Sequence, residues 1–402
     1  MSEPTGIHVH SEIGRLKKVL LHRPGKEIDN LTPGNKETML FDDLPDAMLA
    51  GIEHDAFAET LRSQGVETVY IEDLLADLLS NIDVRDSFIR DFLTEGKIHA
   101  KNIDPLTEWL MDFSDSRELV DLLIAGIRNN KKNFPLKLPT APSHEQLMIL
   151  DPMPNLYFSR DPFSFIGTGV SLSSMYTKVR QRETLLGDYI FRYHPDYNHL
   201  SLHYDRNAPY PLEGGDILVL SDRVIAVGIS ERTNIKAIQL LAENILSEET
   251  GFKYVLAIKI PVKRAFMHLD TVLTMIDNDV FTIHPEIEDD ITVFELSRVN
   301  GEIKIKYQDD SLAVIFAKYL GLDQVTLIPC GGGDPIDAQR EQWSDGSNTL
   351  AIEPGKVVVY SRNHVTNQIL EEAGVELLRI PSSELSRGRG GPRCMSMPIR
   401  RE

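Results

Sequence analysis

Apolar residues recur along the chain in a repeating unit of two short strands, one amphipathic helix and a third strand. The unit is clearest in the middle of the chain, where apolar runs at 217–220 and 224–228 flank a short polar turn and predict a hairpin. Residues 233–248 then carry apolar side chains at helical spacing, and residues 254–260 return to an extended apolar run. Such a unit cannot bury its own apolar face. We therefore expect its copies to pack against one another, in a line or in a ring.

Four further segments repeat this pattern, which makes five copies in all. Their expected strands and helices lie at 16–22, 46–63 and 66–71; 163–166, 170–173 and 182–191; 272–275, 280–284, 312–320 and 325–328; 350–352, 357–360, 365–373 and 376–380. The copy that begins at 163 is the weakest of them. Strands that alternate with helices in this way are typical of an α/β protein, and we predict that fold class.

Residues 74–146 depart from the repeat and show helical spacing alone. Their apolar positions group at 74–79, 88–92, 109–113 and 119–127. A segment rich in Lys, Asn and Pro follows them. We therefore expect an all-helical bundle inserted between the first and second units. The predicted domains are the repeated units, formed by residues 1–73 and 147–402, and the inserted bundle, formed by residues 74–146.

The composition of the chain limits its possible partners and its cellular compartment. The chain has 402 residues, a hydrophobic content of 42% that suffices for a full core, and a formal net charge of −19. This acidic balance disfavours nucleic acids and anionic membranes as partners. Two cysteines cannot form a disulfide framework, which favours a reducing cytoplasm. The first residues lack the pattern of a signal peptide, and no apolar run is long enough to span a bilayer.

One of the two cysteines, Cys394, lies close to the C-terminus in a loop rich in glycine and arginine. Gly388, Gly390 and Gly391 precede it, and Pro392 fixes the backbone just ahead of the sulfur. Small residues would give a ligand access to the thiol, and the neighbouring arginines would favour the thiolate. We therefore consider Cys394 a candidate nucleophile in an exposed loop. The alternatives are a disordered basic tail and an RNA-binding segment, and the acidic net charge argues against the second.

Polar residues also gather where the predicted hairpins begin. The segments lie at 155–162, 213–216, 268–271 and 330–334. If the units closed into a ring, equivalent positions would converge on its axis. One pocket would then contain Asp161, Glu213, His268, Asp270 and Cys394. Residues i and i+2 of an extended segment point the same way, so that the histidine and aspartate at 268 and 270 would project together.

Each of these segments also has a simpler interpretation. A His-x-Asp pair is often a hydrogen-bonded surface pair, Glu-Gly-Gly-Asp is often a turn, and an Asp before Pro commonly opens one. Cys330 ends an apolar strand, which favours a buried structural thiol. Three carboxylates and one histidine could ligate a metal, but no second histidine lies at the spacing of a metal motif. We therefore expect no metal.

Taken in order along the chain, these segments resemble the arginine deiminase family of the guanidine-modifying (pentein) superfamily. The resemblance is carried by residues 41–45, 151–163, 213–216, 267–271 and 388–398 and runs the length of the chain. The last segment is highly specific, and the others are specific as an ordered set. The resemblance implies a five-bladed, pseudo-symmetric ββαβ propeller, in agreement with the five repeats. It also implies the helical insertion typical of the bacterial branch.

The resemblance further implies a mechanism without metal or organic cofactor. Asp161 and Asp270 would hold the planar guanidinium of the substrate, and Cys394 would attack its central carbon. His268 would act as acid and base, and Glu213 would orient it. The carboxylates near Cys394 should raise the pKa of its thiol, whereas a bound cation and the flanking arginines should lower it. The sequence leaves this balance open.

Four more residues are expected, by the same resemblance, to bind free L-arginine, the arginines at 180 and 232 through its α-carboxylate with Asn155 assisting. They are Asn155, Arg180, Arg232 and Arg389. Arg389 matches a residue of the loop beside the nucleophile, and for Arg180 the alternative is a solvated helix start. The implied reaction is the hydrolysis of L-arginine to L-citrulline and ammonia through a covalent amidino-cysteine.

Other functions stay open at this point. Within the superfamily they are an agmatine deiminase and an amidinotransferase, in which an amine replaces water. Outside it they are a Cys/His hydrolase of amides and a non-catalytic arginine-binding protein. The expected partner is a small molecule, L-arginine, and neither a nucleic acid nor a membrane. Assembly into a homo-oligomer is compatible with the sequence.

Overall fold

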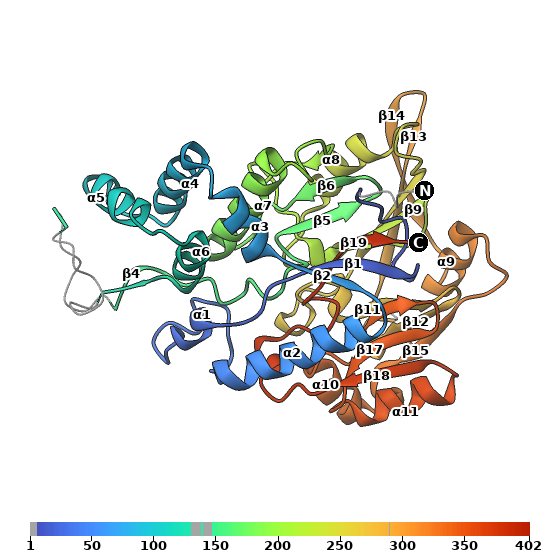
Figure 1. Cartoon of the computed structure of the whole chain (residues 1–402). Helices are drawn as coiled ribbons and strands as arrows, with labels where there is room; N and C mark the ends of the chain where they lie inside the picture. Colours follow the sequence, from blue (N-terminus) through green and yellow to red (C-terminus); the bar gives the residue numbers. More distant parts are fainter. Residues whose placement is uncertain (1–5, 130–137, 140–146, 289) are drawn as a thin grey trace.

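The chain folds into a series of small sheets that share one topology (Figure 1). The computed structural model describes residues 6–129, 138–139, 147–288 and 290–402. Within these residues, five sheets have a strand that pairs antiparallel with one neighbour and parallel with the other. In sheet order, these strands are β5 (Phe163–Ile166), β6 (Gly169–Leu172) and β7 (Leu202–Tyr204); β8 (Ile217–Val219), β9 (Val224–Ile229) and β10 (Tyr254–Lys259); β11 (Leu273–Asp277), β12 (Val280–Ile283) and β15 (Thr326–Pro329); β16 (Leu350–Glu353), β17 (Lys356–Tyr360) and β18 (Glu376–Ile380); β19 (Met397–Arg401), β1 (Leu16–Leu21) and β2 (Glu67–Tyr70). The α/β class is therefore confirmed.

A helix connects the two parallel strands of each of these sheets. Parallel strands need such a crossover because both run in the same direction. In the described part of the chain the connecting helices are α2 (Ala47–Ser63), α7 (Gln181–Tyr193), α8 (Ile235–Ile245), α9 (Leu312–Leu320) and α11 (His364–Glu372). Each lies where the apolar spacing predicted a helix. None of the described helices is long and apolar enough to cross a membrane.

Helix α8 shows how the local sequence determines where a connecting helix begins and which of its faces is buried. The Asn234 side chain accepts a hydrogen bond from the backbone N–H of Lys236 (2.9 Å) and so begins the helix. Ile238, Leu241 and Ile245 follow at helical spacing, and each side chain is fully buried. The residues that directly precede the helix are thereby held at the edge of the core. They belong to the candidate site described below.

The two ends of the chain share one sheet. Strand β1 pairs antiparallel with β19, with Leu20 opposite Met397, and parallel with β2. The sequence predicted only one strand before the helix of this unit, and β19 supplies the missing one from the other end of the chain. Because β19 begins three residues after Cys394, this pairing anchors the loop that carries the candidate nucleophile.

A long hairpin was missed by the sequence interpretation. Strands β13 (Thr292–Val299) and β14 (Glu302–Gln308) project at the upper right of Figure 1. They come from the fourth repeat, yet β13 pairs antiparallel with β10 of the third. The sheet of β8, β9 and β10 therefore has five strands, in the order β14-β13-β10-β9-β8.

Helices also occupy the region in which a bundle was expected. They are α3 (Ile71–Leu78), α4 (Ile82–Glu95), α5 (Ala100–Met111) and α6 (Ser116–Ala125), at the left of Figure 1. Their apolar faces pack together, because Phe88, Phe92, Leu106, Leu110 and Leu119 are each fully buried in one cluster. The short strands β3 (Ile127–Arg128) and β4 (Met148–Leu150) pair at the base of these helices. Most of the predicted Lys/Asn/Pro-rich exit lies outside the described residues.

Candidate active site

The loop that carries Cys394 is buried, whereas the sequence predicted an exposed loop. Cys394 is 3% exposed, and residues 388–399 are all buried. Glycine makes this packing possible, since a Cβ on Gly390 would collide with the ring of Phe158. The backbone N–H of Cys394 donates a hydrogen bond to Asn348 Oδ1 (3.0 Å). The glycines thus bring the loop close to the core instead of leaving it open to solvent.

Residues from several sheets meet at this loop around a small cavity. Its volume is about 20 Å³, which is room for about one water molecule. The predicted site residues that line it are Asn155, Asp161, Arg180, Arg232, His268, Arg389 and Cys394. The two others, Glu213 and Asp270, contact His268 and Cys394 respectively. The structure therefore brings all nine residues together.

His268 and Glu213 form a buried acid–base pair. The His268 Nε2 atom lies 2.8 Å from Glu213 Oε2, and its Nδ1 atom lies 3.7 Å from Asp161 Oδ1. Burial opposes a charge on the imidazole, but Asp161 and Glu213 outweigh it and raise the pKa of His268 to about 9. Burial likewise opposes a charge on Glu213, yet the hydrogen bond from His268 and the nearby Arg232 lower its pKa to about 2. The pair is therefore an imidazolium and a carboxylate at neutral pH.

Asp270 connects the candidate nucleophile to a buried arginine. The Cys394 Sγ atom lies 3.5 Å from Asp270 Oδ2, and Arg393 Nη1 donates to the same oxygen (2.7 Å). Burial and the carboxylates of Asp270 and Asp161 raise the pKa of the Cys394 thiol well above its usual value, and Arg393 opposes them only in part. The sequence left open whether the carboxylates or the arginines dominate the pKa of Cys394, and in the structure the carboxylates and burial favour the thiol.

Both aspartates keep one oxygen available. Asp161 Oδ1 and Asp270 Oδ1 are buried, and neither has a hydrogen-bond partner in the described parts of the chain. A buried carboxylate oxygen without a donor is costly, so such atoms call for a ligand or a water. A guanidinium, with donors in a fixed planar fork, suits two such acceptors.

Arg180 is also buried, which rules out a solvated helix start. Its Nη1 atom donates to Asp161 Oδ2 (2.6 Å), and its Nε and Nη2 atoms donate to Glu183 Oε2 (3.0 and 2.8 Å). Nη2 also lies 3.2 Å from the carbonyl oxygen of Asn155, whose side chain donates to Met39 O (2.8 Å). The Arg180 cation is thus fully paired with protein carboxylates.

Arg232 and Arg389 retain unused donors. Arg232 is 3% exposed, and its Nη1 atom lies 3.8 Å from Glu213 Oε2. Its Nε atom lies 3.6 Å from Glu231 Oε1 but has no hydrogen-bond partner among the described residues. Arg389 stacks on Trp343 at the end of α10 (Pro335–Trp343), with its guanidinium carbon 3.4 Å from the ring centre. Its Nε and Nη1 atoms likewise lack hydrogen-bond partners within the part of the chain that the structure describes. Two such arginines beside one cavity favour an anionic ligand group.

Comparison with known proteins shows sequence similarity along nearly the whole chain. A sequence profile of the arginine deiminase family matches residues 37–401. Arginine deiminase from Streptococcus agalactiae is 50% identical over 414 residues and that from Streptococcus pyogenes is 50% identical over 415, each with 100% of both chains covered. The chain belongs to the arginine deiminase family.

More distant solved structures share the fold. The cyanobacterial arginine dihydrolase ArgZ, as its N-terminal domain bound to product, aligns with a TM-score of 0.54 at 13% identity, covering 96% of this chain and 97% of that one. AgrE in complex with L-arginine aligns with a TM-score of 0.55 at 15% identity, over 96% of this chain and 40% of its own. The amidinotransferase SxtG from Microseira wollei aligns with a TM-score of 0.54 at 14% identity, over 98% of both chains.

Several residues at this family site were missed by the sequence interpretation. Arg393 donates to Glu12 through Nε (3.0 Å) and Nη2 (3.1 Å) as well as to Asp270. Asn348 joins Cys394 to the same aspartate, because its Nδ2 atom donates to Asp270 O (2.9 Å). Adjacency to Cys394 was a signal for Arg393. Glu12 and Asn348 gave none, since they reach the site only through the fold.

Cys330 has the surroundings of a structural thiol, as expected. It is fully buried, and Thr366 Oγ1 lies 3.4 Å from its sulfur. Burial raises the pKa of its thiol to about 11. The hydroxyl of Thr366 takes the place at Cys330 that the Asp270 carboxylate takes at Cys394. Cys330 is therefore a matched comparison for the candidate nucleophile, since both cysteines are buried and neither forms a disulfide.

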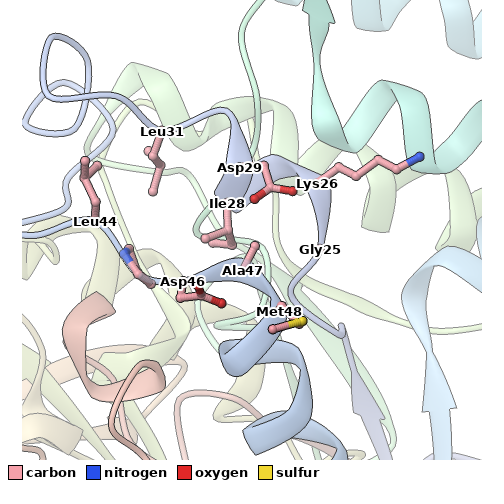
Figure 2. Close-up of a pocket in the computed structure, with 10 residues that line it drawn as sticks. Gly25, Lys26, Ile28, Asp29, Leu31, Leu44, Asp46, Ala47 and Met48 are labelled. Atoms are coloured by element: carbon pink, nitrogen blue, oxygen red, sulfur yellow. The ribbon is translucent and has the colours of Figure 1, made fainter.

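A larger pocket lies elsewhere, between α1 (Lys26–Asp29) and the start of α2 (Figure 2). Its volume is about 500 Å³, and its walls combine apolar side chains such as Ile28 and Met48 with a few charged ones. Asp46 in this wall caps α2 by accepting a hydrogen bond from the backbone N–H of Leu49 (2.8 Å). The lining contains neither a thiol nor a histidine, so size alone does not mark the reactive site.

Proposed function

We propose that the protein hydrolyses free L-arginine to L-citrulline and ammonia through a covalent amidino-cysteine on Cys394. The observation that supports this most directly is the pair of buried aspartates, Asp161 and Asp270, each with an oxygen free to accept a guanidinium N–H beside the thiol. The streptococcal arginine deiminases, at 50% identity over the full length, support the same substrate.

The substrate cation would itself activate the nucleophile. Burial and the neighbouring carboxylates keep Cys394 as a thiol, which is a poor nucleophile. A guanidinium bound between Asp161 and Asp270 would offset those negative charges and lower the thiol pKa. The thiol would lose its proton to solvent, because His268 is already protonated, and the thiolate would form a C–S bond to the central guanidinium carbon. The thiolate would thus appear only when its target is in place.

His268 would move the protons. As an imidazolium it donates a proton to one amino group, the C–N bond breaks and ammonia leaves the amidino-cysteine behind. The neutral imidazole then takes a proton from a water that adds to the same carbon. When the C–S bond breaks, the proton of the added hydroxyl passes to the sulfur, which releases citrulline and restores the Cys394 thiol, and the ammonia takes up the proton that the thiol lost at the start. In total, the arginine cation and water give citrulline and an ammonium ion.

Arg232 and Arg389 would bind the α-carboxylate of the substrate, since both keep unused donors. Asn155 and Arg180 would complete this end of the pocket. Arg180 would act partly by holding Asp161, with which it is paired. Because the cavity holds about one water, the lining would have to move apart for arginine to enter.

The same proposal extends to the architecture. Five sheets of one topology, the last joining both ends of the chain, support a closed five-bladed ββαβ propeller formed by residues 1–73 and 147–402. The helices α3 to α6 support an inserted bundle at residues 74–146, with α3 beginning slightly earlier, at Ile71. The proposed chemistry uses side chains alone, without metal or organic cofactor. A homo-oligomer remains compatible with this arrangement.

Turnover of free arginine by the purified protein tests the proposal. We expect citrulline and ammonia in equal amounts, because each C–N cleavage releases one of each. We also expect the rate to survive exhaustive chelation, since the steps above are carried by side chains. An arginine-binding protein would release no ammonia, and an amide hydrolase would form no citrulline. Loss of activity on chelation with recovery on adding a divalent ion would contradict the proposed mechanism.

A further inference from the structure

Asp216 is a fully buried carboxylate with no part in the chemistry described above. It ends the Glu-Gly-Gly-Asp segment and lies just before β8. Its two oxygens accept hydrogen bonds from different turns: Oδ1 from the backbone N–H of Leu269 (2.8 Å) and Oδ2 from the hydroxyl of Ser230 (2.7 Å). Aspartates are rarely fully buried unless they are paired, so a buried aspartate that joins two turns does more than form a turn of its own.

The first of these bonds fixes the turn that carries the candidate acid. Leu269 directly follows His268, so that Asp216 holds the peptide next to the imidazole. Room for the carboxylate comes from Gly228, where a Cβ would collide with Asp216 Oδ1. Burial raises the pKa of Asp216 to about 6, with His268 opposing that shift, so the group is mainly ionised at neutral pH.

The second bond reaches the other end of the site. The Ser230 hydroxyl oxygen accepts from the backbone N–H groups of Arg232 (3.0 Å) and Thr233 (3.2 Å). The Thr233 hydroxyl in turn accepts from the backbone N–H of Glu213 (3.1 Å). A single carboxylate therefore connects the backbones that carry His268, Arg232 and Glu213.

We propose that Asp216 is a positioning residue, which fixes His268, Glu213 and Arg232 relative to one another and favours the imidazolium form of His268 by its negative charge. The effect on turnover rests on the proposed function. The charged groups that face His268 are Asp161, Glu213 and Asp216. The cations of Arg180 and Arg232 lie behind the first two of these carboxylates.

Asp216→Asn keeps the size of the side chain and removes its charge. An amide also presents an N–H group to one of the two donors, which weakens one bond of the pair. We expect kcat to fall about 10- to 100-fold, a part of the roughly 10²- to 10⁴-fold that a positioned acid–base group supplies. The KM for arginine should rise as well, through Arg232.

The pH profile separates positioning from mere stability. Removing a negative charge disfavours the imidazolium, so the pKa of His268 should fall below its present value of about 9. The basic limb of kcat, which reports loss of the imidazolium, should then move to lower pH by about one unit. NMR titration of the His268 ring should show the same displacement without any turnover.

Two variants serve as controls. Asp222→Asn removes an exposed carboxylate from the turn between β8 and β9 and should change neither kcat nor the titration. Ser230→Ala breaks only the second branch and should raise KM while leaving the titration of His268 in place. This variant also tests the network if Asp216→Asn fails to fold.

The outcomes distinguish the two claims. Wild-type protein that forms no citrulline would refute the proposed function, while the NMR titration would still test Asp216. A folded Asp216→Asn protein with the wild-type kcat and the wild-type titration would overturn the positioning role. So would an unchanged KM in Ser230→Ala if Asp216→Asn cannot be obtained folded.

Discussion

Cys394→Ala is expected to abolish citrulline formation from arginine, with a loss of roughly 10⁵-fold or more. Removing the nucleophile leaves no atom to form the C–S bond, and losses of this order are typical when the nucleophile of a covalent mechanism is removed. The loop is buried, so the truncation should cost stability, but only by about 1 kcal/mol because a single heavy atom is lost. Steady-state assays together with thermal unfolding would separate these two effects.

Cys330→Ala is the matched control for that variant. Both thiols are buried and form no disulfide, and each substitution removes one sulfur atom. Cys330 lies beside Thr366 and away from the aspartate–histidine cluster, so this variant should retain most of the activity. The reverse pattern, an active Cys394→Ala protein and an inactive Cys330→Ala protein, would move the nucleophile to the glycine turn at 330–333.

Arg232→Ala is expected to reduce arginine turnover far more than agmatine turnover. Agmatine is arginine without the carboxylate, so it keeps the contacts to Asp161, Asp270 and Cys394 but makes no use of Arg232. Loss of one partner of a buried charge pair costs about 2–5 kcal/mol. This corresponds to roughly a thirty- to several-thousand-fold loss for arginine. Comparing kcat/KM for the two substrates in wild type and variant measures the effect.

Arg180→Ala should behave differently. The Arg180 cation is already paired with Asp161 and Glu183, so its removal leaves buried carboxylates unpaired whichever substrate is present. We expect turnover of both substrates to fall, with a smaller difference between arginine and agmatine than in Arg232→Ala. If wild-type protein turned over agmatine as well as arginine, or if Arg232→Ala weakened both equally, the carboxylate role of Arg232 would be wrong, although the deiminase chemistry could stand.

The periodic part of the fold was predictable from local sequence. Short apolar runs and helical spacing located the repeated strands and helices, because each buries one face against its neighbours. Strand β19 was missed because it pairs with β1 at the opposite end of the chain, and no local pattern encodes such a partner. The hairpin β13–β14 carries alternating apolar and polar residues in Glu302–Gln308, a signal of a half-buried strand that the repeat pattern obscured.

The candidate site likewise has a part that was predictable from the sequence and a part that was not. Residue types and motif order were enough to propose Cys394, His268 and Asp270. The structure places Cys394 beside Asp270 and has His268 and Cys394 line the same cavity. The pairing of Arg180 with Asp161 and the connections made by Asp216 depend on distances between segments far apart in sequence. The burial of the Cys394 loop was mispredicted for a related reason. Glycine-rich segments are commonly exposed, but here the missing side chains make room for Phe158.

The covalent intermediate tests the central claim most directly. Wild-type protein would be mixed with arginine, quenched in acid during turnover, digested and examined by mass spectrometry. We predict that the peptide containing Cys394 gains the mass of arginine less ammonia, and that the corresponding peptide of Cys394→Ala gains nothing. An adduct on Cys330 or another residue, or an unmodified Cys394 peptide while citrulline accumulates, would contradict the account.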